Sequence, residues 1–357
     1  MGGSTAVADL RAPFVWFGGK RRVAAEVWAA IGPVDNYVEP FAGSLAVLLG
    51  RPDDRWQTGA ETVNDLDGYL ANFWRALTAA PEEVARYADW PVNEVDLTAR
   101  HAWLVTSGRE RLSKLQSDPD FYDAKVAGWW VWGVNAWIGS GWCFGNGPWV
   151  LDADGILVDS RQRPHLGNAG KGINRQLPHL GSRGNDKPGK EASREALTSY
   201  FCGLARRLKR VRVCCGDWQR VVTMGALAYG STVGVFLDPP YDEEVRGNSI
   251  YSTDRSGQES LSAEVRAWAL ANGDDPRLRI VLAGYEAEHA EAMPPTWRVL
   301  SYSANKAYGS RSAVGFGVGN DANRHNERLW FSPHCMGQTD SPLFTNPIAA
   351  APAPAVE

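Results

Sequence analysis

Short apolar segments alternate with helix-like segments toward both ends of this chain, and this alternation constrains the fold more than any other feature. Strand-like segments at residues 36–40 and 61–65 are each followed by a helix-like segment, at residues 44–49 and 68–77. Strands that alternate with helices build βαβ units around a mostly parallel sheet. The sequence therefore predicts an α/β fold.

The same alternation returns after about residue 195. A helix is expected there first, followed by five strands, over residues 196–210, 211–215, 232–237, 279–284, 298–303 and 327–332.

The middle of the chain does not follow this pattern. Residues 98–142 look helical and carry many tryptophans, whereas residues 145–192 are rich in Gly, Pro, Asn and Arg and show little periodicity. One face of the helical part contains Val126, Trp130 and Trp137, and we expect it to be the core of this insertion.

The simplest organisation is one α/β domain that an insertion interrupts. Its two halves are expected at residues 1–95 and 196–335, and the insertion at residues 96–195. Residues 336–357 form a Pro- and Ala-rich tail that is expected to be disordered.

Composition excludes several classes of protein. Of 357 residues, 44% are hydrophobic and 22% charged, as in globular proteins with a packed core. No apolar run is long enough to span a membrane, and the N-terminus lacks the pattern of a secretory signal. The five cysteines form no CxxC pair and do not combine with the six histidines at zinc-ligand spacing. We therefore expect a reduced, cytosolic protein without a metal.

A local basic segment is the one reason to expect a nucleic-acid partner, because the formal net charge of the chain is −4. Residues 155–215 hold thirteen Lys and Arg against four Asp and Glu. Such a segment suits contact with phosphates, and its arginines can reach guanine edges. For any single arginine, a solvated loop is the alternative. The candidates for DNA contact are Arg161, Arg163, Lys171, Arg175 and Arg183.

The most specific motif directly follows the expected strand at residues 232–237. It consists of Asp238, Pro239, Pro240 and Tyr241. Ligands of open parallel sheets bind at the carboxyl ends of strands, and the two prolines make this end stiff and leave its carbonyls without competing N–H donors. A strand-ending turn is the alternative reading of the tetrapeptide alone.

Two further motifs place glycines at the start of helices. Gly18 and Gly19 precede Lys20, whose ammonium group can bind a carboxylate, although the spacing is not that of a P-loop. The second motif follows the strand at residues 36–40 and has the strand–turn–helix geometry in which a cofactor rests on a helix N-terminus. It comprises Glu39, Pro40, Phe41, Ala42, Gly43 and Ser44.

Asp65 ends the second expected strand, about twenty residues after the glycine turn. An acid at this place binds ribose hydroxyls in Rossmann-like sheets. A helix follows, so Asp65 as its N-cap is the alternative.

The order of these motifs resembles the Dam-like, alpha-type N6-adenine DNA methyltransferases, and most closely their phage and prophage members. The chain reads FGGK, EPFAGS, NDLD, a long insertion and then DPPY, and the resemblance covers roughly residues 13–95 and 200–333. It implies a Rossmann-like, class I S-adenosylmethionine-dependent sheet with a mostly helical, basic insertion. It also implies site-specific methylation of double-stranded DNA in the cytoplasm of a bacterial or phage-infected cell.

The resemblance assigns roles to residues of this chain. Trp16, Gly18, Gly19 and Lys20 are implied to hold S-adenosylmethionine, with Lys20 near its carboxylate. The turn from Glu39 to Ser44 is implied to lie under its methionine part, Asp65 to bind its ribose, and Asp217 and Trp218 to contact its adenine. Asp238 to Tyr241 match the catalytic tetrapeptide, and Asp238 also borders the cofactor. The family often has a second glycine where this chain has Leu45, so the geometry of cofactor binding is open at this point.

The chemistry of the tetrapeptide suits an exocyclic amine. The carboxylate of Asp238 and the carbonyl of Pro239 can accept the two hydrogens of the amine, which frees its lone pair for the methyl group. The base must leave the duplex, and Tyr241 is expected to stack on it. N4-cytosine methyltransferases usually carry Ser-Pro-Pro-Tyr, so Asp238 favours adenine. The alternatives are cytosine methylation and a DNA-binding relative without activity. The recognition sequence and a partner nuclease are not predicted.

Overall fold

The structure is a computed structural model. It describes residues 10–14, 16, 19–52, 57–118, 120–137, 142–143, 149–151, 157–159, 194–240, 260–302 and 327–337. Most of the predicted tail and the basic residues from Arg161 to Arg183 lie outside these residues.

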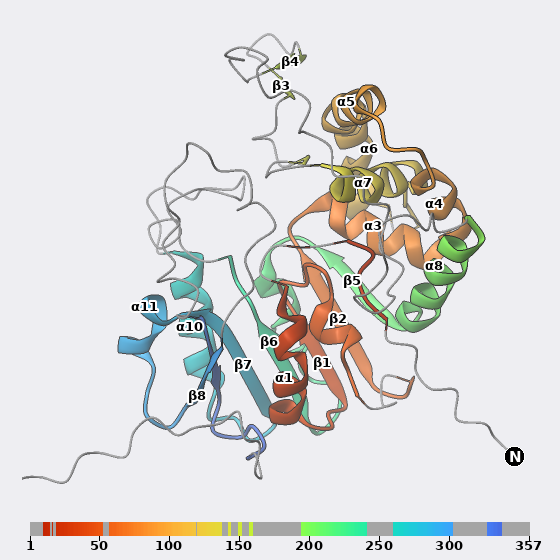
Figure 1. The fold of residues 1–357 in the computed structure, drawn as a ribbon. Coiled ribbons are helices and arrows are strands. Elements are labelled where there is room, and N and C mark those ends of the chain that lie inside the picture. Colours follow the sequence, from red (N-terminus) through yellow and green to blue (C-terminus); the bar gives the residue numbers. More distant parts are fainter. Residues whose placement is uncertain are drawn as a thin grey trace, which may run out of the picture.

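A seven-stranded sheet with the order β5-β2-β1-β6-β7-β9-β8 forms the centre of the molecule (Figure 1). The strands from β5 to β7 in this order are parallel, and β9 is antiparallel to both of its neighbours. This arrangement confirms the predicted α/β, Rossmann-like fold. The strands are β1 (Asn36–Glu39), β2 (Ala60–Asp65), β5 (Val211–Cys215), β6 (Val233–Leu237), β7 (Leu278–Tyr285), β8 (Arg298–Tyr302) and β9 (Glu327–Phe331).

The central strands are apolar on both faces because helices cover both sides of the sheet. Every residue of β6 is buried. Val235 packs into the core on one face, whereas Phe236 packs into the core on the other. Gly234 lets a helix approach closely, since a Cβ there would lie 2.5 Å from Cγ2 of Ile31.

Two helices cover opposite faces of the sheet. The first is α1 (Ala24–Ile31), which continues the 3₁₀ helix η1 (Lys20–Val23) and packs on β6 and β7. The second is α10 (Leu261–Asn272), whose Val265 and Ala269 belong to the core on the other face.

Most other helices gather beside β2 and β5, at the upper right of Figure 1. They are α3 (Gly68–Ala79), α4 (Pro81–Ala88), α5 (Glu94–Trp103), η3 (Leu104–Gly108), α6 (Arg109–Leu112), η4 (Ser113–Gln116), α7 (Ala124–Ala136) and α8 (Arg194–Leu208). The remaining elements are α2 (Ala46–Leu49), η6 (Trp218–Val221), α11 (Glu286–His289), η7 (Ala290–Ala292) and the two-stranded sheet of β3 (Trp149–Leu151) and β4 (Leu157–Asp159).

The core continues across the expected start of the insertion at residue 96. Helix α7 is buried on nearly every side and packs on α3 and α4. Its Trp130 contacts Phe14 and Phe73, with ring centroids 5.1 and 5.6 Å apart, and all three belong to the hydrophobic cluster that includes α1. The tryptophan-rich face is therefore core, as expected, but of the α/β domain itself.

Candidate active site

The predicted site residues meet at one edge of the sheet. Asp238 follows β6, Glu39 ends β1, Asp65 ends β2 and Gly216 follows β5, and these four strands are adjacent and parallel. Parallel strands place their carboxyl ends at the same edge. Four segments that are separated in the sequence are thus brought together.

Lys20 lies beside Asp238. Its Nζ is 2.9 Å from Oδ1 of Asp238, and the side chains are only 4% and 19% exposed. The glycine before Lys20 precedes the helical turn η1, as the sequence predicted. Pro239 is buried and Pro240 partly buried, whereas Tyr241 and Gly18 lie outside the described residues.

Three side chains from other segments contact Gly43, in the turn after β1. Its backbone has a φ of +47°, and a Cβ would lie 2.8 Å from Cδ1 of Trp16. Its N–H donates to Oδ2 of Asp65 at 3.0 Å, and its carbonyl accepts from Nε1 of Trp74 at 3.2 Å. Glycine is required here because any side chain would meet the Trp16 ring.

Leu45, at the place where the resembled family often has glycine, adopts the left-handed conformation with φ +56°. The left-handed conformation costs a residue with a Cβ about 1–2 kcal/mol. The side chain is fully buried, and burying a leucine stabilises by about 1.5–3 kcal/mol. The backbone therefore keeps the shape that glycine would give it, and core packing offsets the strain.

Asp65 organises two turns. Besides Gly43, its carboxylate accepts from the backbone N–H of Asp67 at 3.0 Å. The alternative role as a helix cap is wrong, because Asp67 caps α3 by accepting from Tyr69 at 2.8 Å and from Leu70. Burial raises the pKa of Asp65. Burial, and the nearby charge of Asp65, raise the pKa of Asp67 to about 7.

Sequence reasoning missed two residues that hold the site together. Asn64 is 1% exposed, and its amide donates to the carbonyls of Pro40 at 3.0 Å and Gly216 at 2.9 Å. It thus ties the loops after β1 and β5. Trp74 is the other, through its bond to Gly43. The place of Asn64 next to Asp65, at the end of an expected strand, was the available signal for it. The sequence held no such signal for Trp74.

Asp217 and Trp218 lie at the end of β5. Asp217 is exposed and caps η6 by accepting from the N–H of Gln219 at 2.9 Å. Trp218 is 4% exposed, and its ring centroid lies 5.9 Å from that of Phe41. Its Nε1 is buried without a hydrogen-bond partner among the residues that the structure describes.

Glu39 is the most deeply buried acid of the site, at 2% exposure. Burial raises its pKa well above the usual range, and the charges of Asp238 and Glu61 raise it further. Hydrogen bonds from the hydroxyl of Tyr37, 3.3 Å from Oε2, and from the backbone of Leu48 act in the opposite direction.

The arrangement suits a ligand that carries positive charge and a carboxylate. Three acids, Glu39, Asp65 and Asp238, lie at adjacent strand ends, and the ammonium group of Lys20 is paired with Asp238. Aromatic rings favour cations near their faces, and the ring of Trp16 fills the space beside the Gly43 turn. A buried indole N–H on Trp218 adds an unused donor.

Within the described parts of the chain, no group of three or more His, Cys, Asp and Glu is placed to hold a metal ion. Nor does any helix found there have the length and apolar character needed to cross a membrane.

Residues 16–97 match the family model for the D12 class N6 adenine-specific DNA methyltransferases. This range contains Trp16, Lys20, the Gly43 turn and Asp65 but ends before Asp238. A search of curated proteins found no match to the chain.

Proposed function

With the domain of the D12 class N6 adenine-specific DNA methyltransferases at residues 16–97, this chain is an adenine DNA methyltransferase, and we propose how its residues perform the reaction. A methyl group passes from S-adenosylmethionine to N6 of an adenine that has been flipped out of duplex DNA. Asp238 and Pro239 receive the amine, and the neighbouring strand ends hold the cofactor.

The observation that carries this proposal is the position of Asp238. It follows β6, beside the acid that ends β1, and an ammonium group lies 2.9 Å from its carboxylate. The amine of adenine is a poor nucleophile because its lone pair is delocalised into the ring. A carboxylate and a stiff proline carbonyl that accept its two hydrogens stabilise the positive charge that develops on nitrogen.

S-adenosylmethionine supplies a methyl group that its sulfonium already activates, so the protein has only to bind and orient the two reactants. Asp238 then needs no high basicity, because the amine becomes acidic as the methyl group arrives. After transfer, the excess proton of the amine leaves through the carboxylate of Asp238 to solvent. Tyr241 stacks on the extruded base, which must be unpaired to reach the carboxylate.

We assign the cofactor to the edge formed by β6, β1, β2 and β5. Lys20 binds its carboxylate, and the turn from Glu39 to Ser44, together with Trp16 and Gly19, holds its methionine part. Asp65 accepts from ribose hydroxyls, and Asp217 and Trp218 border the adenine. Asp65 already accepts from the backbone N–H groups of Gly43, Asp67 and Leu66. A carboxylate has about four acceptor sites, so one is left for the ribose.

The test of this function is Asp238→Ala. We expect methyl transfer from labelled S-adenosylmethionine to duplex DNA to fall by about 100- to 1,000-fold or more, while the affinity for the cofactor changes little. Mass spectrometry of the digested DNA should show N6-methyladenine in the wild-type reaction. N4-methylcytosine would contradict the assignment of the base, and activity of the variant within tenfold of wild type would contradict the role of Asp238.

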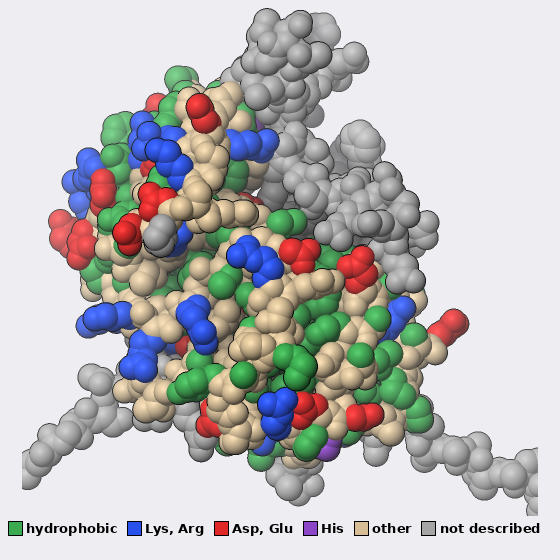
Figure 2. Space-filling view, turned by 180° about the vertical axis from the view of Figure 1, so that it is seen from behind, with side chains coloured by type: hydrophobic (Ala, Val, Ile, Leu, Met, Phe, Trp, Pro, Cys, Tyr) green, Lys and Arg blue, Asp and Glu red, His purple; other side chains and the backbone are tan. Residues whose placement is uncertain are grey.

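The DNA-reading segment is proposed to be the part of the insertion after α7. The face drawn in Figure 2 shows basic and acidic side chains interspersed, with no continuous basic surface among the described residues. Arg207, one of the basic residues between 155 and 215, is buried against Glu61. We assign DNA contact to Arg161, Arg163, Lys171, Arg175 and Arg183 on the excess of basic over acidic residues between 155 and 215.

Exchanging segments tests this assignment. Residues 144–193 are replaced by the corresponding segment of another enzyme of the class, which leaves the buried helix α7 intact. We expect the set of methylated sequences, read from plasmid DNA of expressing cells, to change to that of the donor. An unchanged set of methylated sites in an active chimera would refute the assignment.

A further inference from the structure

We propose that this protein releases a proton when it binds S-adenosylmethionine, and that Glu39 is the group that loses it. The inference rests on the proposed function, because it concerns the same cofactor site. It adds a link between cofactor affinity and pH that the transfer reaction itself does not require.

Glu39 occupies the centre of the proposed cofactor edge. It is the last residue of β1, which lies between β2 and β6 in the sheet, and its side chain is 2% exposed. The turn that holds the methionine part begins at the next residue. A cation bound over this turn is therefore close to the Glu39 carboxyl.

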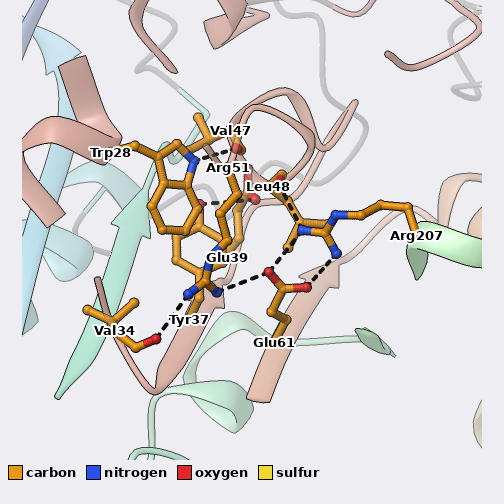
Figure 3. A network of polar contacts seen from close by, with 9 residues as sticks. All are labelled: Trp28, Val34, Tyr37, Glu39, Val47, Leu48, Arg51, Glu61 and Arg207. Atoms are coloured by element: carbon orange, nitrogen blue, oxygen red, sulfur yellow. Dashed lines mark hydrogen bonds and ion pairs between the residues drawn. The ribbon is translucent and has the colours of Figure 1, made fainter. Parts of the chain in front are cut away.

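Charged and titratable groups lie on the elements around Glu39, and Figure 3 draws Tyr37, Arg51, Glu61 and Arg207 among them. They are Tyr37 on its own strand, Glu61 on β2, Asp238 after β6, Lys20 on η1, Arg51 after α2 and Arg207 on α8.

The cations of this group are engaged by other acids. Lys20 is paired with Asp238. Arg51 contacts Glu61 at 3.2 Å, and Arg207 contacts the same carboxylate at 2.6 and 2.9 Å. Across the described residues, no cation lies within ion-pair distance of Glu39.

The proposal requires Glu39 to be protonated at neutral pH in the protein without cofactor, and the surroundings of its carboxyl group favour that form. Burial penalises its charged form, and the nearest acids, Asp238 and Glu61, penalise it further. Its hydrogen bonds with Tyr37 and the backbone of Leu48 do not overcome these effects on its pKa.

Cofactor binding reverses this balance. It brings a sulfonium and an ammonium group to the turn beside Glu39, and a nearby positive charge favours the ionised carboxyl. One O–H bond of Glu39 breaks, its electron pair stays on the carboxylate, and the proton passes to the buffer. By linkage, a ligand whose binding releases a proton binds more tightly as pH rises.

Calorimetry tests the proposal directly. S-adenosylmethionine is titrated into the full-length protein at about pH 6.5, where the amine of the cofactor is protonated, in buffers with different enthalpies of ionisation. We expect the observed heat to depend on the buffer with a slope that approaches one proton released per cofactor bound. Glu39→Gln keeps the size of the neutral acid and should bind without this dependence.

Two further variants test whether Glu39, and not a neighbouring group, loses the proton. Asp67→Asn removes an acid near the site whose pKa is raised to about 7, and Tyr37→Phe removes the hydroxyl that contacts Glu39. Both variants should still release the proton. Buffer-independent heats in the wild type, or equal release by Glu39→Gln, would overturn the proposal. Absence of any binding heat in the wild type would instead contradict the proposed function.

Wild-type measurements decide the matter if Glu39→Gln does not fold. The affinity for S-adenosylmethionine should rise as pH increases from about 6 to about 7, and infrared difference spectra should lose the carbonyl band of a protonated carboxyl on binding. A flat pH dependence together with an unchanged carboxyl band would refute the proposal.

Discussion

Single carboxyl groups at this site differ in charge because their surroundings differ. Asp238 has an ammonium group 2.9 Å away, whereas Glu39 faces other acids and is buried. Asp67 lies beside Asp65 and has a pKa of about 7. Residue type alone therefore does not predict which acids carry charge at neutral pH.

Asp67 makes stability depend on pH. Because its pKa is higher in the folded protein, it stabilises the fold below its ordinary pKa, and this contribution is lost as pH rises through about 7. We expect the difference in thermal midpoint between wild type and Asp67→Asn to decrease from about pH 5 to about pH 8.

The matched control for this prediction is Asp35→Asn. Hydrogen bonds from Ser231 lower the pKa of Asp35, so this acid is ionised in both folded and unfolded protein over that range, and its difference from wild type should stay constant. A constant difference for Asp67→Asn as well would contradict the raised pKa of Asp67.

At the level of elements, the turn between β1 and α2 is defined by neighbours rather than by its own sequence. Trp74 on α3 holds the carbonyl of Gly43, Asp65 on β2 holds its N–H, and Trp16 fills the space where a Cβ would lie. Leu45 keeps the left-handed backbone without a glycine. The turn is therefore preorganised for a ligand.

Gly43→Ala should damage cofactor binding. The methyl group would meet the Trp16 ring at 2.8 Å, on a backbone with φ +47°, a strain of about 1–3 kcal/mol. We expect calorimetry to show a loss of affinity for S-adenosylmethionine of about tenfold or more. Gly225→Ala is the matched control, because a Cβ there meets nothing within 4 Å; similar affinities of the two variants would contradict the role of the turn.

At the scale of the whole molecule, a buried network of charged residues joins the two sequence halves that form the sheet. Glu61 on β2 bonds to Arg207 on α8, which lies 146 positions away, and to Arg51 (Figure 3). The arginines also donate to the carbonyls of Leu48 and Val34. This buried network connects the segment that returns after the insertion to the first half of the sheet.

Glu61→Gln should destabilise the whole protein. Removal of one member leaves two buried guanidinium groups without their carboxylate, and breaking a buried pair costs about 3–5 kcal/mol. We expect a clearly lower thermal midpoint. Arg86→Gln is the control: its pair with Glu83 is 57% and 49% exposed, so its loss should change stability by about 0.5 kcal/mol at most. Equal effects of the two substitutions would contradict the role of the network.

The count of basic residues between 155 and 215 did not predict where on the fold those residues would lie. Four exposed basic residues, Arg206, Lys209, Arg210 and Arg212, lie near the end of α8 and the start of β5. This is the amino end of that strand, whereas Asp238 lies at the carboxyl ends. Within residues 194–215, these exposed basic side chains therefore lie at the opposite end of the parallel strands from Asp238.

The sequence by itself predicted the strands of the central sheet in chain order, with each strand end within about one residue of its place in the structure. Apolar alternation, glycines and prolines act within a few residues, and the strand at residues 211–215 was predicted residue for residue. The tertiary structure alone decided that Lys20 pairs with Asp238, that Asn64 and Trp74 hold the glycine turn, and that α7 shares the core of the sheet. These partners come from distant segments, and which groups meet depends on how the whole chain packs.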